Sequence, residues 1–126
     1  MGKRKKKEPK IECIAYLSTE GDLEKAEIYE NRQERYIREY AKAHNIDIVG
    51  IERRHAFGMQ DVNLQFHRMA LLVANKKVDG VIVTNMAAVS TDLVDAYRKV
   101  GMIRAAGGYM VTVDEGRLGM NIREVM

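Results

Sequence analysis

Apolar and polar stretches alternate along this chain in a way that predicts four strands separated by three helices. The first and central strand is the mostly apolar run 11–19, which lies between a charged segment and Glu20-Gly21-Asp22. Nearly continuous apolar residues suit a strand that is buried on both faces. Further strands are predicted at 45–51, 78–84 and 109–113, and the run 78–84, the most β-branched of them, should be central and parallel.

Between these strands, apolar residues recur every three or four positions, which predicts the helices. The first helix runs from a capping Asp22 to about His44, and its inward stripe consists of Ala26, Tyr29, Gln33, Tyr36, Ile37, Tyr40 and Ala41. On its other side, arginines are interleaved with glutamates, at Glu30, Arg32, Glu34, Arg35, Arg38 and Glu39. This pattern favours a solvated face with ion pairs over a basic stripe that binds a ligand.

The second predicted helix runs from Asp61 to about Lys76, with a stripe of core residues at Val62, Phe66, Met69 and Val73. The third helix begins at Ser90 or Thr91, stops at Gly107-Gly108, and presents inward Leu93, Tyr97, Val100 and Ile103. Loops are expected at 53–61 and 85–89. The last stretch, 117–126, suits one short amphipathic helix, which is marginal at this length without a partner to pack on.

This order of elements predicts an α/β fold, a three-layer sandwich around a mostly parallel four- to five-stranded sheet with right-handed crossovers. We expect one domain over 11–126, without an internal repeat. In open α/β sheets, ligands bind beyond the carboxyl ends of the strands. Ser18 and Thr19, at the end of the first strand, therefore mark the first candidate site, although a Ser-Thr pair is also common as a helix cap.

The composition is that of one globular domain, with 126 residues of which 46% are apolar. No apolar run approaches the ~20 residues that cross a bilayer, and no apolar segment of a secretory signal follows the first charges, so we expect a cytoplasmic protein without membrane contact. The single cysteine, Cys13, should be a small core residue. Three scattered histidines and no Cys/His pair at ligand spacing predict neither a metal site nor a cofactor.

The net charge of +3 comes from the first ten residues. They carry six Lys or Arg and one Glu, whereas the other 116 residues hold 15 Lys or Arg against 17 Asp or Glu. A block of like charges followed by Pro9, the only proline, predicts a disordered basic tail at 1–10. Any contact with DNA should be weak and should be made by this tail, through Lys3, Arg4, Lys5, Lys6, Lys7 and Lys10.

Four segments follow one another along the chain: Ser18-Thr19, the run 33–41 (QERYIREYA), Phe66-His67-Arg68-Met69 and the run 77–83 (KVDGVIV). Their order and spacing, over about 11–116, resemble the catalytic domain of serine recombinases, the resolvase/invertase family. It implies that a serine after the first strand attacks a DNA phosphodiester and becomes linked to a DNA 5′ end, while a cluster of arginines binds the scissile phosphate. Ser18 stands at the position of this nucleophile, and Gln33 is a second matched site residue.

The arginines of the family pattern are replaced in this chain. Tyr16 stands two residues before the serine, the segment 63–66 reads NLQF where the family has Arg-Pro-Gly-Phe, and the segment 85–91 (NMAAVST) lacks the acid and both arginines of Asp-Leu-x-Arg-Leu-x-Arg. Each donor lost from such an oxyanion site typically costs about 10² to 10³ in rate. Ser18 is therefore predicted to be vestigial. Substitutes for the lost arginines are available nearby only in Arg53, Arg54 and Arg68.

The sequence thus predicts an inactive homologue of resolvases and invertases from a mobile element, which acts as a DNA-associated accessory or protein-interaction module. We expect a homo-oligomer or a hetero-oligomer with an intact recombinase, because the residues after Gly116 are too apolar for a free tail. Two alternatives stay open. One is an active catalytic-domain fragment that cleaves DNA through a covalent phosphoserine, and the other is a small-ligand module in which Tyr16, Asn85 and Ser18 line a neutral polar pocket.

Overall fold

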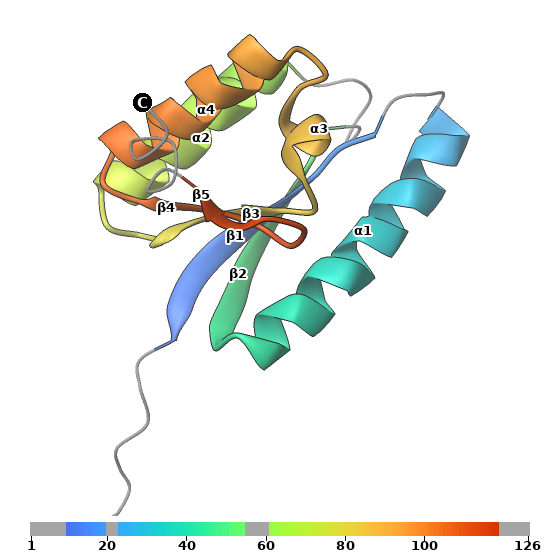
Figure 1. The fold of residues 1–126 in the computed structure, drawn as a ribbon, viewed down its shortest axis with the longest axis horizontal. Helices are drawn as coiled ribbons and strands as arrows, with labels where there is room; N and C mark the ends of the chain where they lie inside the picture. The colour runs from blue at the N-terminus through green and yellow to red at the C-terminus, as the bar shows by residue number, and fades with distance from the viewer. Residues whose placement is uncertain (1–9, 20–22, 55–60, 119–126) are drawn as a thin grey trace, which may run out of the picture.

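The structure is a computed structural model that describes residues 10–19, 23–54 and 61–118. Its elements follow in the order β1 (Ile11–Leu17), α1 (Leu23–Ala43), β2 (Ile46–Arg53), α2 (Val62–Ala74), β3 (Gly80–Val83), α3 (Met86–Val89), α4 (Leu93–Ala105), β4 (Tyr109–Thr112) and β5 (Gly116–Leu118). The strands form one sheet in the order β2-β1-β3-β4-β5, parallel except for β5 (Figure 1). The predicted α/β fold is confirmed, and β1 and β3 are inner strands.

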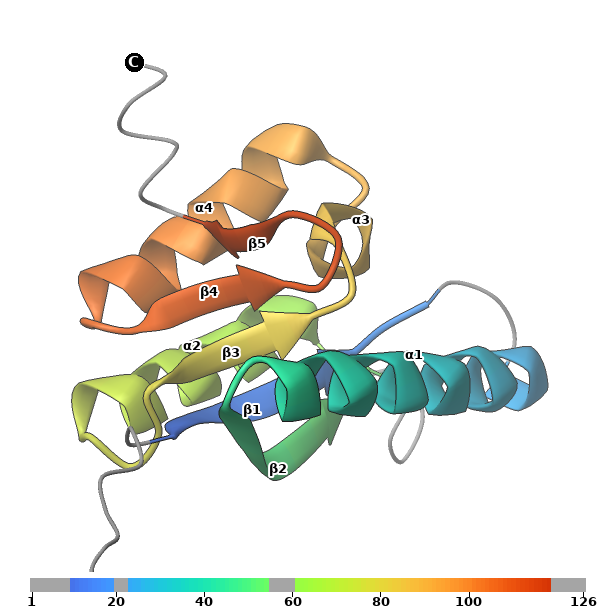
Figure 2. The same ribbon diagram turned by 60° about the horizontal axis from the view of Figure 1, so that its bottom comes forward.

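The sheet is the middle of three layers. Figures 1 and 2 show α1 on one face of the sheet and α2, α3 and α4 on the other. Alternate residues of β1 belong to different cores: Ile14 and Tyr16 pack on the side of α2 and α4, whereas Cys13, Ala15 and Leu17 pack on the side of α1. Cys13 is a buried core residue, as predicted. A strand buried on both faces explains why the run 11–17 is almost entirely apolar.

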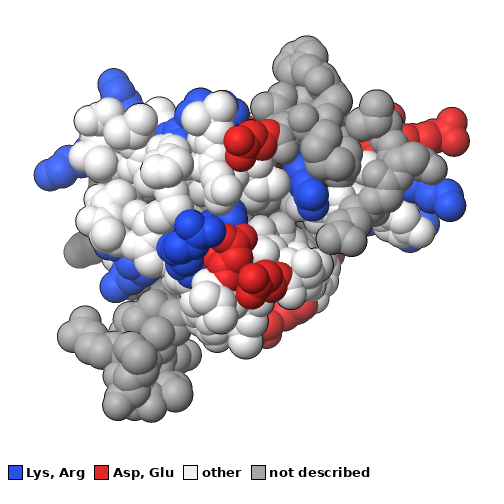
Figure 3. Space-filling model, turned by 90° about the horizontal axis from the view of Figure 1, so that it is seen from above, with Lys and Arg blue, Asp and Glu red and all other residues white. Residues whose placement is uncertain are grey.

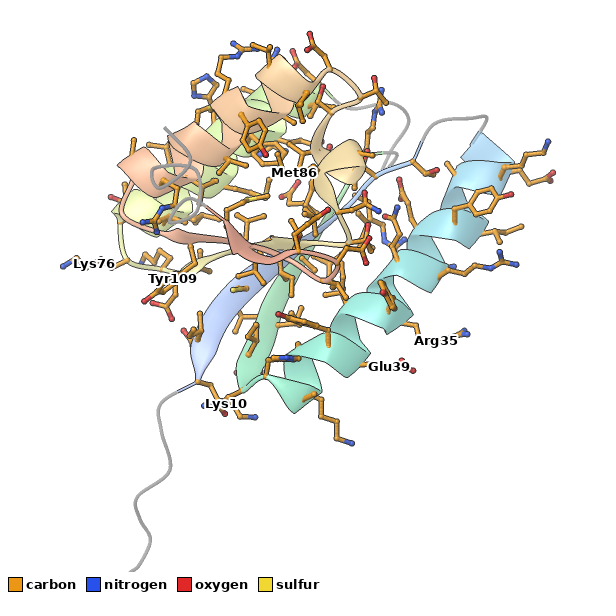
Figure 4. All side chains as sticks on the ribbon, viewed as in Figure 1. Lys10, Arg35, Glu39, Lys76, Met86 and Tyr109 are labelled. Atoms are coloured by element: carbon orange, nitrogen blue, oxygen red, sulfur yellow. The ribbon has the colours of Figure 1, made fainter. Side chains whose placement is uncertain are left out.

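Helix α1 matches its predicted extent, but its inward face differs from the prediction. Ile37 and Ala41 are buried, whereas Tyr29 and Tyr36 are 46% and 49% exposed. Glu30, predicted on the solvated face, is 1% exposed, because its carboxylate meets Arg53 of β2 at 3.8 Å. The rest of the ionic face is as predicted: Arg35 and Glu39 point away from α1 in Figure 4, and Arg38 pairs with Glu34 at 2.9 Å.

Helix α2 has the predicted cap and stripe. The side chain of Asp61 accepts a hydrogen bond from the Leu64 N–H at 3.2 Å. Phe66, Met69 and Val73 are buried, and Gln65 is buried beside them. The inward face of α2 therefore includes one polar side chain that the apolar stripe did not predict.

Helix α4 begins three residues later than the earliest predicted start, and Asp92 caps it. Leu93 and Tyr97, predicted to face inward, are 61% and 41% exposed. Packing against α2 and the sheet instead buries Ala96 and Lys99 together with Val100 and Ile103, which lie on one face at spacings of three and four.

Two segments differ from the sequence prediction. The expected loop 85–89 contains the short helix α3, whose cap is Asn85. The segment predicted to begin a helix at Arg117 belongs instead to β5, because the open edge of β4 provides backbone hydrogen-bond partners for an antiparallel strand. Residues 1–9, the predicted cap Asp22 and residues 119–126 lie outside the described residues, so the predictions made for them stay predictions.

Candidate functional site

A cavity of about 530 Å³ lies beyond the carboxyl ends of β1 and β3, where ligands bind in open α/β sheets. The end of β1 contributes Ser18 and Thr19 to its wall, and α1 contributes Gln33. Arg54, which follows β2, also lines the cavity. The rest of the wall comes from the start of α2 and from residues between Asn85 and Lys99. The fold therefore brings the two predicted catalytic residues, Ser18 and Gln33, to one site.

The side chain of Gln33 fixes the backbone of Ser18. The Ser18 N–H donates to Gln33 Oε1 at 2.9 Å, and Gln33 Nε2 donates to the Ser18 carbonyl oxygen at 2.7 Å. A glutamine amide suits this contact because it carries one acceptor and one donor group. Gln33 thus ties the end of β1 to α1, and Ser18, with 5% of its surface exposed, sits at the base of the cavity.

Tyr16 occupies the position two residues before Ser18, and its side chain is completely buried behind the cavity wall. Its ring meets Phe66 edge-on at a centroid distance of 5.0 Å, and its hydroxyl donates to Gln65 Oε1 at 3.1 Å. Burial raises the pKa of Tyr16 to about 12, against smaller lowering effects of the Ser18 hydrogen bond and the Arg54 charge. This position therefore holds a neutral phenol at physiological pH.

Three other positions at which the sequence resemblance implies arginine lie on the cavity wall, and none carries a charge. They are Asn63, Ala88 and Thr91. Asn85, where the resemblance implies an acid, accepts a hydrogen bond from the Ala88 N–H at 3.0 Å and caps α3. The described wall thus presents amide, hydroxyl and methyl groups at the places where the pattern implies guanidinium groups.

Two cations line the described part of the cavity, Arg54 and Lys99. Lys99 is 3% exposed and pairs with Asp95. Hydrogen bonds from Lys99 and Arg98 lower the pKa of Asp95 to about 2. Arg54 forms no ion pair with any described residue, and its Nε is buried without a hydrogen-bond partner among them.

The other two arginines suggested as substitutes form ion pairs outside the cavity. Arg53 turns to α1, where it meets Glu34 at 2.8 Å, and Arg68 pairs with Glu52 at 3.4 Å on the outer side of α2. Neither lines the cavity. Of the three candidates, only Arg54 reaches the site.

Sequence reasoning missed two buried polar residues near the site, Gln65 and Lys99. Gln65 joins the tyrosine to β2, since its Nε2 donates to the Arg53 carbonyl oxygen at 2.9 Å. Its spacing of four and eight positions from Met69 and Val73 would have placed it on the inward face. Lys99 has the same kind of signal, because it lies four positions before the buried Ile103.

Within 10–19, 23–54 and 61–118, no group of three or more His, Cys, Asp or Glu residues is placed to hold a metal ion. Among the helices of these ranges, none is both long and apolar enough to cross a membrane.

The architecture and the position of the cavity define this chain as an α/β domain with its site at the carboxyl ends of a mostly parallel sheet. No protein-family model and no curated protein sequence matches the chain. Solved structures do: a resolvase family site-specific recombinase from Streptococcus pneumoniae has a TM-score of 0.70 at 18% identity, over 85% of this chain and 74% of that one. The C-terminal catalytic domain of ISC1926 TnpA, an IS607-like serine recombinase, has a TM-score of 0.63 at 17% identity, over 91% and 76% of the two chains. The protein therefore has the fold of serine recombinase catalytic domains, as the sequence resemblance predicted.

Proposed function

We propose that this protein is a serine-recombinase-fold domain that does not cleave DNA and acts as an accessory component of recombination in a mobile element. The observation that carries the proposal is the lack of charge at the four positions where the resemblance implies arginine, with a buried phenol at Tyr16 and uncharged groups at Asn63, Ala88 and Thr91. The accessory role that we propose places its protein and DNA contacts on parts of the chain other than these four positions. The accessory role therefore remains available to a domain of this fold.

The magnitude of the missing electrostatic stabilisation supports the inactive state. A serine hydroxyl is a weak nucleophile, so attack on a phosphodiester needs several charge-assisted donors around the developing negative charge. Arg54 can provide one such donor group. If three others are missing at about 10² each, the reaction is slower by roughly 10⁶, and non-additivity still leaves a large deficit.

The test is a cleavage assay on supercoiled plasmid that carries sites from the same mobile element. Wild type, Ser18→Ala and Thr19→Ala are incubated with the plasmid and quenched with detergent, and an intact resolvase on its own site serves as positive control. We expect neither nicks nor covalent adducts from any of the three proteins. An adduct formed by wild type and Thr19→Ala but absent from Ser18→Ala would favour the alternative, an active catalytic-domain fragment.

We further propose that affinity for DNA resides in the segment 1–10. Residues 11–126 carry two more acidic than basic groups, and on the face shown in Figure 3 blue and red groups are scattered among uncharged ones. If about five phosphates are neutralised, log K should fall with log salt at a slope of roughly −4 to −5, with dissociation constants around 10⁻⁴ to 10⁻⁶ M. Binding to two unrelated duplexes is compared with and without residues 1–10. Affinity that survives the truncation, or a strong preference for one duplex, would place the contact on the folded domain.

Association with a second subunit is the other part of the proposed role. The outer faces of α2 and α4 expose large apolar side chains: Leu64 at 54%, Leu71 at 62%, Leu93 at 61% and Val94 at 78%. Exposed apolar surface of this kind is common at protein interfaces. Sedimentation velocity of the protein alone and mixed with an intact recombinase from the same element tests the proposal. A monomer in both samples, unchanged by deletion of residues 117–126, would contradict it.

A further inference from the structure

Arg54 is a cation on the cavity wall that forms no ion pair with any described residue. Its backbone N–H donates to the Leu17 carbonyl oxygen at 2.9 Å, which holds it beside the end of β1. The other basic residues nearby are all paired: Arg53 with Glu34, Arg68 with Glu52, and Lys99 with Asp95. Arg54 lines the cavity without such a partner in 10–19, 23–54 or 61–118.

The Nε of Arg54 is buried and has no hydrogen-bond acceptor among the described residues. An unsatisfied donor on a charged group is costly, and this Nε is closed to a ligand in the cavity. A guanidinium is a planar fork that binds both oxygens of a carboxylate or phosphate group. Because Arg54 lines the cavity and forms no ion pair with a described residue, its terminal N–H groups are available to an anion there.

The volume and chemistry of the cavity indicate the size and kind of this anion. A volume of about 530 Å³ lies within the usual range of small-molecule sites. Besides Arg54, the wall carries the hydroxyl and amide groups of Thr91 and Asn63 and the methyl groups of Ala87 and Val89. Such a wall suits a short carbon skeleton that bears hydroxyl groups.

We propose that the cavity binds a small hydroxylated organic anion, a sugar acid or a sugar phosphate, whose charged group is held by Arg54. This inference goes beyond the accessory role, which requires no ligand at this site. The proposed ligand also offers a role for a cavity whose described wall lacks the arginine cluster implied by the family pattern.

Duplex DNA fits the cavity less well than a small anion does. A duplex carries one negative charge per about 1.7 Å of its axis, so it would bring several phosphates to the wall at once. Among the described residues the wall offers one guanidinium without an ion-pair partner, and it also presents the carboxylate of Asp61. This carboxylate repels a polyanion, whereas a small ligand can place its single charged group on Arg54.

Isothermal titration calorimetry on the full chain tests the proposal with D-ribose 5-phosphate and sodium D-gluconate at constant ionic strength, and with neutral D-ribose for comparison. We expect at least one of the two anions to bind and D-ribose not to bind. Arg54→Gln should weaken binding by about tenfold or more, the typical value of a charge-assisted hydrogen bond. Arg38→Gln, an exposed arginine of α1 outside the cavity, is the matched control and should leave binding unchanged.

Thermal denaturation separates a ligand-binding role of Arg54 from a structural one. A binding residue with an unsatisfied Nε predicts that Arg54→Gln keeps or raises the melting temperature without ligand and loses the increase caused by the anion. A lower melting temperature without ligand, together with unchanged affinity, would overturn the proposal. So would the absence of heat with both anions up to about 10 mM, or displacement of a bound anion by a short duplex in an Arg54-dependent way.

The cleavage assay with Ser18→Ala measures a different property, so failure of the accessory role and failure of this inference can be told apart.

Discussion

Replacement of Tyr16 by phenylalanine removes one buried hydroxyl group from behind the wall of the site. The Tyr16 hydroxyl donates to Gln65 Oε1 at 3.1 Å, and the tyrosine side chain is completely buried. Phenylalanine keeps the edge-on contact with Phe66 but leaves the amide oxygen of Gln65 without this donor. A buried acceptor that loses its donor costs about 1–3 kcal/mol, so Tyr16→Phe should be less stable than wild type by this amount near neutral pH.

The pKa of Tyr16 makes this stability difference depend on pH. Burial raises the pKa in the folded protein from 10.0 to about 12. Below pH 10 the Tyr16 phenol is protonated in the folded and in the unfolded protein, so its contribution to the free energy of unfolding is complete. Above pH 10 the unfolded chain loses the proton first, so the stability falls as the pH rises. At pH 11 the loss is about 1.4 kcal/mol, and above pH 12 it approaches about 2.7 kcal/mol.

Urea denaturation followed by circular dichroism at about pH 8 and about pH 11 measures this effect. The free-energy difference between wild type and Tyr16→Phe should shrink by about 1.4 kcal/mol between the two pH values, because all other titrating groups are shared by both proteins. Tyr36→Phe is the control. Tyr36 is 49% exposed, and although a hydrogen bond to Asp114 raises its pKa, water screens that contact, so its difference should change much less. A Tyr16 difference that is equal at both pH values would refute the assignment of a protonated, buried phenol at this site.

Four further substitutions test the fold and the packing around the site. Asp95→Asn removes the ion-pair partner of the buried Lys99. Because the pKa of Asp95 is lowered from 3.8 to about 2, the ion pair stabilises the fold above pH 4, and this contribution is lost toward pH 2. The melting temperature of the variant should therefore fall less steeply than that of wild type as the pH is lowered from 4 to 2. An equal acid dependence would contradict the ion pair. Gly80→Ala should lower the free energy of unfolding by about 1–3 kcal/mol, because a Cβ there would overlap a backbone carbonyl of β4. Gly101→Ala should raise it by up to about 1 kcal/mol, because a Cβ at this helix position meets nothing within 4 Å in the described protein. Urea midpoints that shift in the same direction would rule out this reasoning. Gln33→Leu removes two hydrogen bonds to the backbone of Ser18 and should lower the free energy of unfolding by about 1–2 kcal/mol. The Ser18 N–H, which donates to Gln33 Oε1, should then exchange its hydrogen faster. Unchanged exchange would show that these two hydrogen bonds are not formed.

The amino-acid sequence by itself determined the order of strands and helices and the class of fold. The apolar run of β1 and the β-branched run of β3 can be satisfied only by strands that are covered on both faces, so their central positions were predictable. The cap Asp61 and the spacing of Phe66, Met69 and Val73 likewise gave α2 almost to the residue. These signals are local, because each depends on neighbours within a few positions along the chain.

The tertiary structure decided which polar side chains are buried and which cation is left unpaired. Glu30 is a charged residue of the amphipathic helix α1, and it lies inside against Arg53, which comes from β2. Lys99 lies inside beside Asp95, which precedes it by four residues on the same helix. Arg54 differs from Arg53 by one position, yet one faces the cavity and the other faces α1 because successive residues at the end of a strand point to opposite sides. The burial of Glu30 and its pairing with Arg53 are set by distant segments that fold together, and no local pattern in the sequence specifies that these two residues will meet.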